Sequence, residues 1–448
     1  MRKMKKAAAL LIFILIVNAA APAQTLNIEQ ARTMALANSR SLAKYNMAIK
    51  SSVLDERNQL YSMLPVLSAD YSASMNYLKE WNFVNPADTF SSGASFSVTQ
   101  IIFQGGKTFI QKAINSIATE SVRKDALAEY FNVLDAVENA YYAALEAAAT
   151  LEAEESSLQT AEISLSIAEI RRSSGMINAG DFLKAQAEKE ARVNSSNQAR
   201  RSIALSQAKL KSLTGIAAGS QIELEQIDFS FYEDVLARLS NITDEQAASL
   251  FEEFRKILAV SNPSLAKAAL NSQRAEKNLS LSKRDFSPVL SASIFSTGFN
   301  YSTERGFNST GSGGVTLKGS IPVDFWITAG KIEKNKIARD SAAIDLLNAE
   351  NSLEAELQAA LLNAIAQAGS VLSSRRSLEY TEKHFEYVME RYRLSQSSVS
   401  DLGDASLLLI NSRNGYIKAS YGFLQTLSKL RSLCAISDEG KLLQLLLK

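Results

Sequence analysis

Residue types with catalytic or metal-binding potential are scarce in this 448-residue sequence, which holds one histidine, His384, and one cysteine, Cys434. One His and one Cys exclude a His/Cys zinc site within the chain, and one Cys excludes an intramolecular disulfide framework. Gly105-Gly106-Lys107 lacks the G-x-x-x-x-G-K-[ST] spacing of a phosphate-binding loop. Because no nucleophile–base pair is visible either, we predict that the protein is not an enzyme and has no catalytic residue, metal site or cofactor.

The first 23 residues have the features of a secretory signal peptide. Basic residues up to Lys6 precede the apolar run from Ala7 to Val17, and Ala21-Pro22-Ala23 provides a small-residue cleavage site. Removal of residues 1–23 changes the formal charge from +1 to −3, with 44 basic and 47 acidic residues left. This balance argues against a nucleic-acid partner. No other stretch reaches the ~18 consecutive apolar residues of a membrane-spanning helix.

Proline and glycine are missing from long stretches that are rich in Ala, Glu, Leu and Gln. Apolar residues recur there at helical spacing, as in Ile110, Ile114 and Ile117. Because Pro breaks helix interiors and Gly weakens them, these stretches predict very long helices with coiled-coil character. The predicted helices pair into two hairpins, 107–173 with 182–213 and 331–394 with 402–433.

Two other stretches, residues 66–104 and 289–326, are rich in Ser, Thr, Tyr, Phe and Val. In the first, Leu67, Ala69 and Tyr71 alternate with polar residues, and the second follows the same rule. A period of two predicts strands. Each stretch is therefore predicted as a β-hairpin, either of a membrane barrel or half-buried on an ordinary soluble sheet.

The order of elements occurs twice along the chain. Leu64-Pro65 corresponds to Ser287-Pro288 with a shift of 223 residues, and Gly106-Lys107 to Gly330-Lys331 with a shift of 224. A repeat of this length indicates a duplicated domain rather than a solenoid. The predicted division is a signal peptide (1–23), a first repeat (24–214, helical hairpin 107–213), an equatorial linker (215–247), a second repeat (248–436, helical hairpin 331–433) and a C-terminal tail (437–448).

Two hairpins supply four strands, which are too few to close a barrel. Open strand edges are not viable in lipid, because each unpaired backbone group costs several kcal/mol there. If the strands enter a membrane, the chain must therefore oligomerise, and three copies would provide twelve strands. The sequence thus favours a cyclic assembly.

The sequence resembles the TolC-like outer-membrane factor family over essentially the whole mature chain. Leu26-Asn27-Ile28-Glu29-Gln30-Ala31 is similar to the family's first helix, and Val260-Ser261-Asn262-Pro263 is its counterpart in the second repeat. Gln100-Ile101-Ile102-Phe103-Gln104-Gly105-Gly106-Lys107 resembles the family's hairpin exit, and Tyr141-Tyr142 its tyrosine pair. The order and duplication of these motifs carry the resemblance.

The resemblance implies a mixed, mainly α fold, in which helical hairpins form a periplasmic α-barrel on a trimeric, twelve-stranded transmembrane β-barrel. It also implies a passive exit duct in the outer membrane, used for efflux or type I secretion. The implied partners are two further copies, a periplasmic adaptor (membrane fusion) protein, an inner-membrane pump or ABC transporter, and outer-membrane lipid. The alternative is a periplasmic or surface coiled-coil structural protein with β-hairpin heads.

The resemblance also places a periplasmic gate at the helix reversals. Asp401 and Asp404 match the family's Asp-x-x-Asp, and Tyr392 matches its gate tyrosine. In a trimer the two acids would form a ring of carboxylates that attracts cations and raises some of their pKa values. The alternative for Asp401 and Asp404 is a helix N-cap, and for Asp181 in the first repeat we expect the cap.

Two positions depart from the family pattern, and two tryptophans are candidates for the membrane interface. Ser395 stands where the family's turn glycine is expected, whereas Gly175 keeps it in the first repeat. Ser397 occupies the place of a gate arginine, so the family's Arg–Asp latch is in doubt. Trp326, directly after a predicted strand, and Trp81 are candidates for an interfacial aromatic belt.

Overall fold

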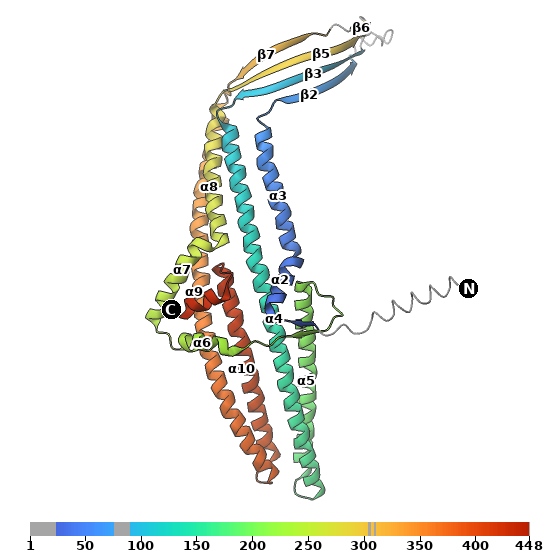
Figure 1. Cartoon of the computed structure of the whole chain (residues 1–448), viewed down its shortest axis with the longest axis vertical. Helices are drawn as coiled ribbons and strands as arrows, with labels where there is room; N and C mark the ends of the chain where they lie inside the picture. The colour runs from blue at the N-terminus through green and yellow to red at the C-terminus, as the bar shows by residue number, and fades with distance from the viewer. Residues whose placement is uncertain (1–23, 76–89, 303–305, 309–310, 448) are drawn as a thin grey trace, which may run out of the picture. The chain divides into compact units, whose positions relative to one another are not determined.

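The computed structural model describes residues 24–75, 90–302, 306–308 and 311–447 (Figure 1). The predicted signal peptide and Trp81 lie outside the described residues. The chain divides into two compact units, each with segments from both repeats. One unit comprises Lys44–Ala126 and Ser264–Asn351, and contains the sheet. The other comprises Met1–Ala43, Leu127–Pro263 and Ser352–Lys448, and its described residues are mainly helical.

Four long helices confirm the predicted helical hairpins. Helix α4 spans Lys107–Ser173 and α5 spans Ala179–Thr214, while α9 spans Phe325–Arg393 and α10 spans Val399–Leu433. Helix α4 has the predicted bounds, because Gly106 precedes it and Gly175 follows it at positive φ. Helix α9 begins six residues before the predicted Lys331. The second β-hairpin is correspondingly shorter than 289–326, and its last strand ends at Ser320.

The larger sheet contains both predicted β-hairpins. Its strands are β2 (Val66–Met75), β3 (Phe90–Phe103), β5 (Val289–Ser302), β6 (Gly306–Asn308) and β7 (Gly313–Ser320). Strands β2, β3 and β5 are neighbours in that order, and β6 and β7 both pair with the far side of β5. All of these pairs are antiparallel. Among the described strands, β2 and the β6/β7 line are therefore the open edges.

The remaining elements precede the two β-hairpins, lie between the repeats or end the chain. They are β1 (Gln24–Leu26), α2 (Ile28–Asn38), α3 (Arg40–Tyr61), β4 (Ile222–Leu224), the 3₁₀ turn η2 (Phe229–Tyr232), α6 (Glu233–Ser240), α7 (Asp244–Ser261), α8 (Pro263–Lys283), the 3₁₀ turn η3 (Arg284–Phe286) and α11 (Glu439–Leu447). Strands β1 and β4 pair in parallel. The Tyr141 hydroxyl donates to the carbonyl oxygens of Leu26 and Glu225, at 3.0 and 2.8 Å, and so ties α4 to this small sheet.

The two strand-to-helix junctions of the duplicated chain meet at one acid. Lys107 Nζ lies 2.9 Å from Asp285 Oδ1, and Lys331, its equivalent in the second repeat, pairs with Oδ2 of the same side chain. Burial acts to raise the pKa of Asp285, but the hydrogen bonds from Lys331 and Lys107 hold it below the ordinary value. Asp285 thus links both repeats where the strands give way to helices.

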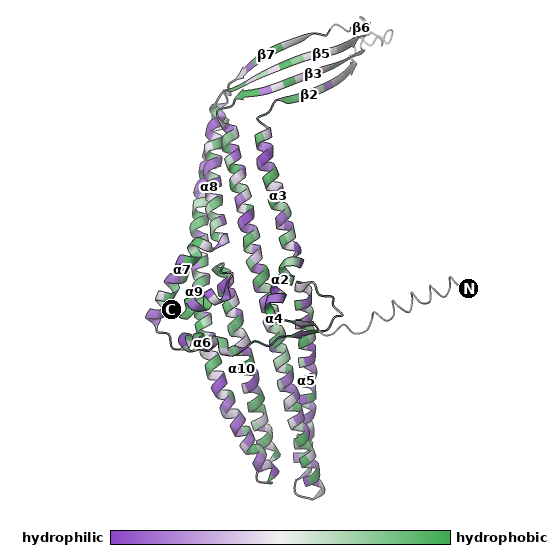
Figure 2. Cartoon of the chain, in the orientation of Figure 1, coloured by the Kyte–Doolittle hydropathy of each residue, from purple (hydrophilic) through white to green (hydrophobic). Residues whose placement is uncertain are grey.

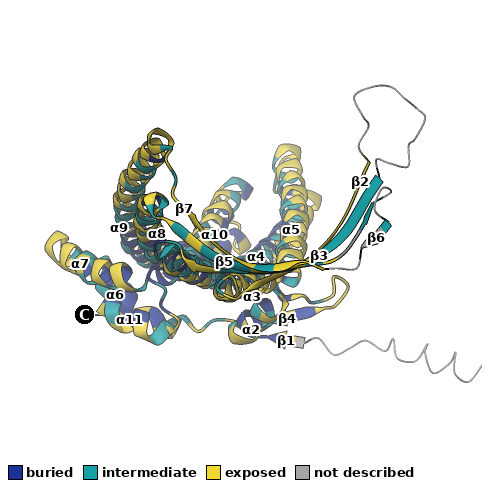
Figure 3. Ribbon diagram, turned by 90° about the horizontal axis from the view of Figure 1, so that it is seen from above, coloured by how far each residue is buried: buried dark blue, intermediate teal, exposed yellow. Residues whose placement is uncertain are grey.

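Buried side chains lie mainly within the helices, whereas the strands of the larger sheet are half-buried or exposed in the isolated chain (Figure 3). Leucine and alanine dominate the core, and the long helices mix apolar and polar residues along their lengths (Figure 2). Among the described residues, no helix has a stretch that is both long and apolar enough to cross a lipid bilayer.

Candidate functional site

The four main strands of the larger sheet present one apolar and one polar face. Directly paired residues in antiparallel strands share a face, so the register assigns each side chain. One face is apolar and exposed across all four strands: Leu67, Tyr71, Met75, Phe96, Val98, Leu290, Ile294, Val315 and Leu317. The opposite face carries mainly hydroxyl groups: Ser68, Ser72, Ser95, Ser97, Thr99, Ser291, Ser293 and Thr316. This division is that of a membrane strand, apolar toward lipid and polar toward a lumen.

The helical hairpins reverse in the same way in both repeats. Gly175 and Ser395, 220 residues apart, both adopt positive φ, +70° and +61°. Met176 N donates to Arg171 O, and Gln396 N donates to Arg391 O, each at 2.8 Å. The geometry is that of a Schellman cap, which suits glycine and strains serine. Ser395 therefore occupies the glycine position of the turn, as the sequence indicated.

Asp401 forms a capping box at the start of α10. The N-cap residue is Ser398, whose hydroxyl accepts a hydrogen bond from Asp401 N at 3.1 Å. The Asp401 carboxylate accepts in return from Ser398 N at 3.0 Å and from Ser397 Oγ at 3.1 Å. These hydrogen bonds, led by that from the Ser398 backbone, lower the pKa of Asp401. Within one chain the pKa of this acid is thus shifted down, not up.

Asp181 occupies the equivalent third position of α5, and the N-cap there is Asn178. Asn178 Oδ1 accepts from Asp181 N at 2.8 Å. The expectation that Asp181 is the cap is therefore wrong. The acid instead lies in the first turn, where a negative charge interacts favourably with the helix dipole.

Tyr392 is fully buried between the two helical hairpins. Its hydroxyl donates to the Ser164 carbonyl oxygen at 3.3 Å, and its neighbours come from both hairpins, among them Ala168 and Leu402. The guanidinium of Arg171, itself buried, stacks 4.2 Å from the Tyr392 ring centre and donates to the Tyr392 carbonyl oxygen. Sequence reasoning missed Arg171. Its place in the last turn of α4, equivalent to Arg391 in α9, was the available signal.

Asp404 is exposed on α10, one turn beyond Asp401, and faces α5 of the first hairpin. Glu188 lies beside it, and a Cβ on Gly403 would stand 2.9 Å from Glu188 Oε2. Burial raises the pKa of Glu188, Arg192 and Lys184 lower it, and Asp404 adds to the rise. Lys184 Nζ also donates to Ser400 Oγ at 2.6 Å. Asp404 of the second hairpin therefore has an acidic neighbour, Glu188, from the first hairpin.

Trp326 does not follow a strand directly. It lies in the first turn of α9 and is 74% exposed, between the exposed Phe325 and Ile327. Phe325 stacks on Phe286 with ring centres 6.2 Å apart. The turn thus places adjoining large apolar side chains on the surface of the sheet unit.

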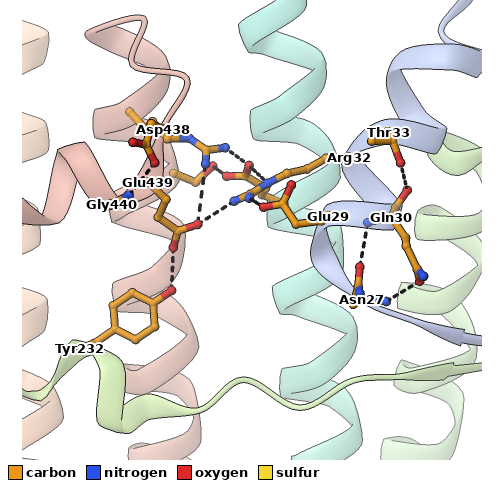
Figure 4. Close-up of polar contacts among 12 residues, drawn as sticks. Asn27, Glu29, Gln30, Arg32, Thr33, Tyr232, Asp438, Glu439 and Gly440 are labelled. Atoms are coloured by element: carbon orange, nitrogen blue, oxygen red, sulfur yellow. Dashed lines mark hydrogen bonds and ion pairs between the residues drawn. The ribbon is translucent and has the colours of Figure 1, made fainter.

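A buried ionic cluster joins α2, near the start of the described residues, to α10 and α11, near their end (Figure 4). Arg32 of α2 reaches Glu138 Oε1 at 2.6 Å and Glu439 Oε2 of α11 at 2.9 Å. Arg431 of α10 pairs with Glu138, and the Tyr232 hydroxyl donates to Glu439 at 2.6 Å. Burial and the nearby Arg32 lower the pKa of Arg431 to about 10. Sequence reasoning missed this cluster, whose members lie up to 407 residues apart.

Within the described residues, no three His, Cys, Asp or Glu side chains lie close enough together to hold a metal ion. Cys434 is buried, and burial raises the pKa of its thiol to about 12.

A duplicated chain of this kind, with a two-faced β-hairpin and a pair of long helices in each half, has the plan of an outer-membrane channel subunit. A family model described as "Outer membrane efflux protein" matches residues 31–216 and 256–435, and the chain belongs to this family. The protein is an outer-membrane efflux channel. The family consists of channels and is not a class of enzymes.

Solved channels share the fold at low sequence identity. The Campylobacter jejuni CmeC outer membrane channel superposes with a TM-score of 0.74 at 15% identity, covering 94% of this chain and 89% of that chain. The CusC structure superposes with a TM-score of 0.76 at 15% identity, covering 93% of this chain and 94% of that chain. The open state of the Neisseria gonorrhoeae MtrE outer membrane channel superposes with a TM-score of 0.71 at 14% identity, covering 91% of this chain and 88% of that chain. A search of the curated proteins finds no match.

Proposed function

We propose that the protein works as a homotrimer and as a passive exit duct, docked on a periplasmic adaptor protein and an inner-membrane pump or ABC transporter. The observation that carries the trimer is the larger sheet, which has one mainly apolar, exposed face and, among its described strands, two open edges. In lipid each unpaired edge group costs several kcal/mol. Edge-to-edge pairing of three copies removes both edges and yields twelve strands.

The exposed first turn of α9 supports an interfacial role for Trp326. Indole and neighbouring apolar side chains favour the boundary between headgroups and hydrocarbon. In the proposed barrel this turn lies just beyond the end of β7, and Trp326 marks the periplasmic membrane boundary.

The tip of the helical hairpins supports a gate. Three copies of Asp401 and Asp404 around one axis would present a ring of carboxylates that attracts cations. Both acids are exposed, but the Asp401 carboxylate is engaged in its capping box, so Asp404, with Glu188 beside it, supplies the stronger selectivity. Asp181 contributes a further acid at the first hairpin.

Arg171 and Tyr392 form the latch of this gate. The family position for a gate arginine is Ser397 here, and Ser397 donates to Asp401 within its own hairpin. Arg171 instead reaches from the first hairpin to Tyr392 of the second. Because this contact joins the hairpins, separating them requires that it break.

Membrane fractionation tests the function as a whole. We expect the mature protein to stay in the outer-membrane fraction after a high-salt wash and to run as a trimer on gels without heating. Release by salt as a monomer would instead support the coiled-coil structural protein. Deletion of the gene, followed by profiling of drug, metal and secretion phenotypes, separates efflux from type I secretion.

A further inference from the structure

The strands of the larger sheet contain two charged residues within their described bounds, Asp70 on β2 and Lys318 on β7. They lie on the two opposite edges of the sheet. Asp70 pairs with Ser95 on β3, and Lys318 pairs with Ser291 on β5, which in turn pairs with Ile101 on β3. Because Ser95 and Ile101 are an even number of residues apart, Asp70 and Lys318 share the polar face.

Within one copy these two side chains are too far apart to interact. Strands β3 and β5 separate them, which is roughly 14 Å at ~4.8 Å per strand. They are also offset by six residues along the strands, or roughly 20 Å. Both are exposed, and neither forms an ion pair with any residue in the described part of the chain.

Closing the barrel sets which residues of two copies meet. Four strands span roughly 19 Å, so a strand tilt of about 35–45° displaces the next copy by roughly 13–19 Å along the strands, or about four to six residues. The displacement must be an even number of residues, because an odd one would turn the apolar face of one copy to the lumen. Displacements of about four and six residues are therefore the two candidates.

The row of paired residues from Asp70 passes through Ser95 and Thr297 to Ser312, whose carbonyl oxygen accepts from Thr297 N at 2.8 Å. The right-handed twist of strands sets the sense of the tilt. In that sense the next copy's β7 is displaced so that residues after Ser312 come opposite Asp70. A displacement of about four residues brings Thr316 there, and one of about six brings Lys318.

We propose that Asp70 of one copy pairs with Lys318 of the next copy on the lumen side of each seam in the barrel. The partner is a second copy of this chain, and the ion pair selects the six-residue displacement. This inference rests on the proposed homotrimer, in which the pair occurs three times. A seam that depends on complementary charges also disfavours closure in the four-residue register, where Asp70 would meet an uncharged hydroxyl.

Cysteine cross-linking in the full-length protein, in outer membranes, tests the register. We expect Asp70→Cys combined with Lys318→Cys to give covalent trimers on mild oxidation. The matched double variant, Asp70→Cys with Thr316→Cys, should give at least five-fold less covalent trimer. Each single variant should give no cross-linked product beyond the background from buried Cys434. Preferential linkage in the Thr316 pair would overturn the proposed register and leave the trimer intact. If neither pair cross-links, a trimer band on unheated gels would overturn the register alone, and the absence of that band would contradict the proposed function.

Charge reversal tests the ion pair without new thiols. Asp70→Lys and Lys318→Asp should each lower the temperature at which the trimer dissociates in detergent, and the double reversal should restore most of the loss. A double variant no more stable than the worse single variant would overturn the pairing. Should the reversals prevent assembly, Asp70→Asn and Lys318→Gln replace them. If the decreases in dissociation temperature caused by Asp70→Asn and by Lys318→Gln simply add in the double variant, the ion pair is likewise overturned.

Discussion

The guanidinium carbon of Arg171 lies 4.2 Å from the ring centre of Tyr392, and the same guanidinium donates to the Tyr392 carbonyl oxygen. Both side chains are buried, with Arg171 7% and Tyr392 0% exposed. The last turn of α4 thus holds the last turn of α9. In the proposed trimer this contact holds each second hairpin against its own first hairpin at the periplasmic tip.

Loss of this contact should weaken closure. A desolvated cation–π contact contributes about 2 kcal/mol, and a hydrogen bond from a charged donor about 1.5–3 kcal/mol. We therefore expect Arg171→Ala to raise the open probability of the channel at least ten-fold in single-channel recordings in planar bilayers. Arg172→Ala is the matched control, because Arg172 stacks at 4.4 Å on Phe182 of its own hairpin. Equal effects of the two substitutions would contradict the latch.

Ser395→Gly should stabilise the second reversal. Ser395 has φ +61°, a conformation that costs a non-glycine residue about 1 kcal/mol. We expect amide hydrogen exchange near the start of α10 to slow about five-fold. The converse control is Gly175→Ala, which meets no atom within 4 Å and should lose a similar amount through φ alone. Unchanged exchange in Ser395→Gly would show that the turn relaxes by another route.

The buried cluster should be intolerant of single substitutions. Glu138 is 1% exposed and faces both Arg32 and Arg431, so its removal leaves two buried cations short of a partner. Breaking such a pair costs about 3–5 kcal/mol. Glu138→Ala should therefore lower the free energy of unfolding by that amount in urea titrations. Glu155→Ala, which removes an exposed pair with Arg200, should change it by less than about 1 kcal/mol.

Acid should weaken the attachment of α11. Burial acts to raise the pKa of Glu439, but hydrogen bonds from Tyr232 and Arg32 hold it below 4.5. Because the folded pKa is lowered, the stabilisation is complete above the unfolded value and is lost as pH falls through the folded one. Hydrogen exchange in α11 should thus be constant from pH 7 to about pH 5 and faster below about pH 4, after correction for intrinsic rates. Glu439→Gln should abolish this dependence, and its persistence would exclude Glu439 as the cause.

Asp404→Asn should reduce cation selectivity more than Asp181→Asn. Asp404 is exposed at the proposed gate beside Glu188, so its charge is the one that permeating ions meet. Reversal potentials in a salt gradient measure the change. Equal selectivity in the wild type and in Asp404→Asn would count against the carboxylate ring.

Much of the fold is predictable from the sequence, because Pro and Gly positions restrict where helices can run. The duplicated order of motifs and the alternation in residues 66–104 follow from the same kind of local pattern. The start of α9 is not predictable in this way. Phe325, Trp326 and Ile327 have side chains that favour strands, yet they form the first turn of α9, where Asp324 O accepts hydrogen bonds from Ile327 N at 3.1 Å and Thr328 N at 3.2 Å.

The site is less predictable than the fold. The capping box of Ser398 and Asp401 is a local motif that the sequence already contains, whereas the Arg171–Tyr392 contact joins residues 221 positions apart. Similarly, the identity of Arg32 says nothing of Glu439, which it meets through the packing of α2 and α11. Long-range polar contacts depend on which helix faces pack together, and single-sequence patterns do not specify that pairing.

Planar-bilayer recording of the purified, full-length protein tests the central claim most directly, provided that it is run beside Arg171→Ala. The account predicts stepwise, cation-selective conductance from a detergent-resistant trimer, with larger or more frequent openings in the variant. A trimer that gives no conductance steps in either form, or a preparation that is monomeric and inserts into no bilayer, would contradict a channel closed by these residues.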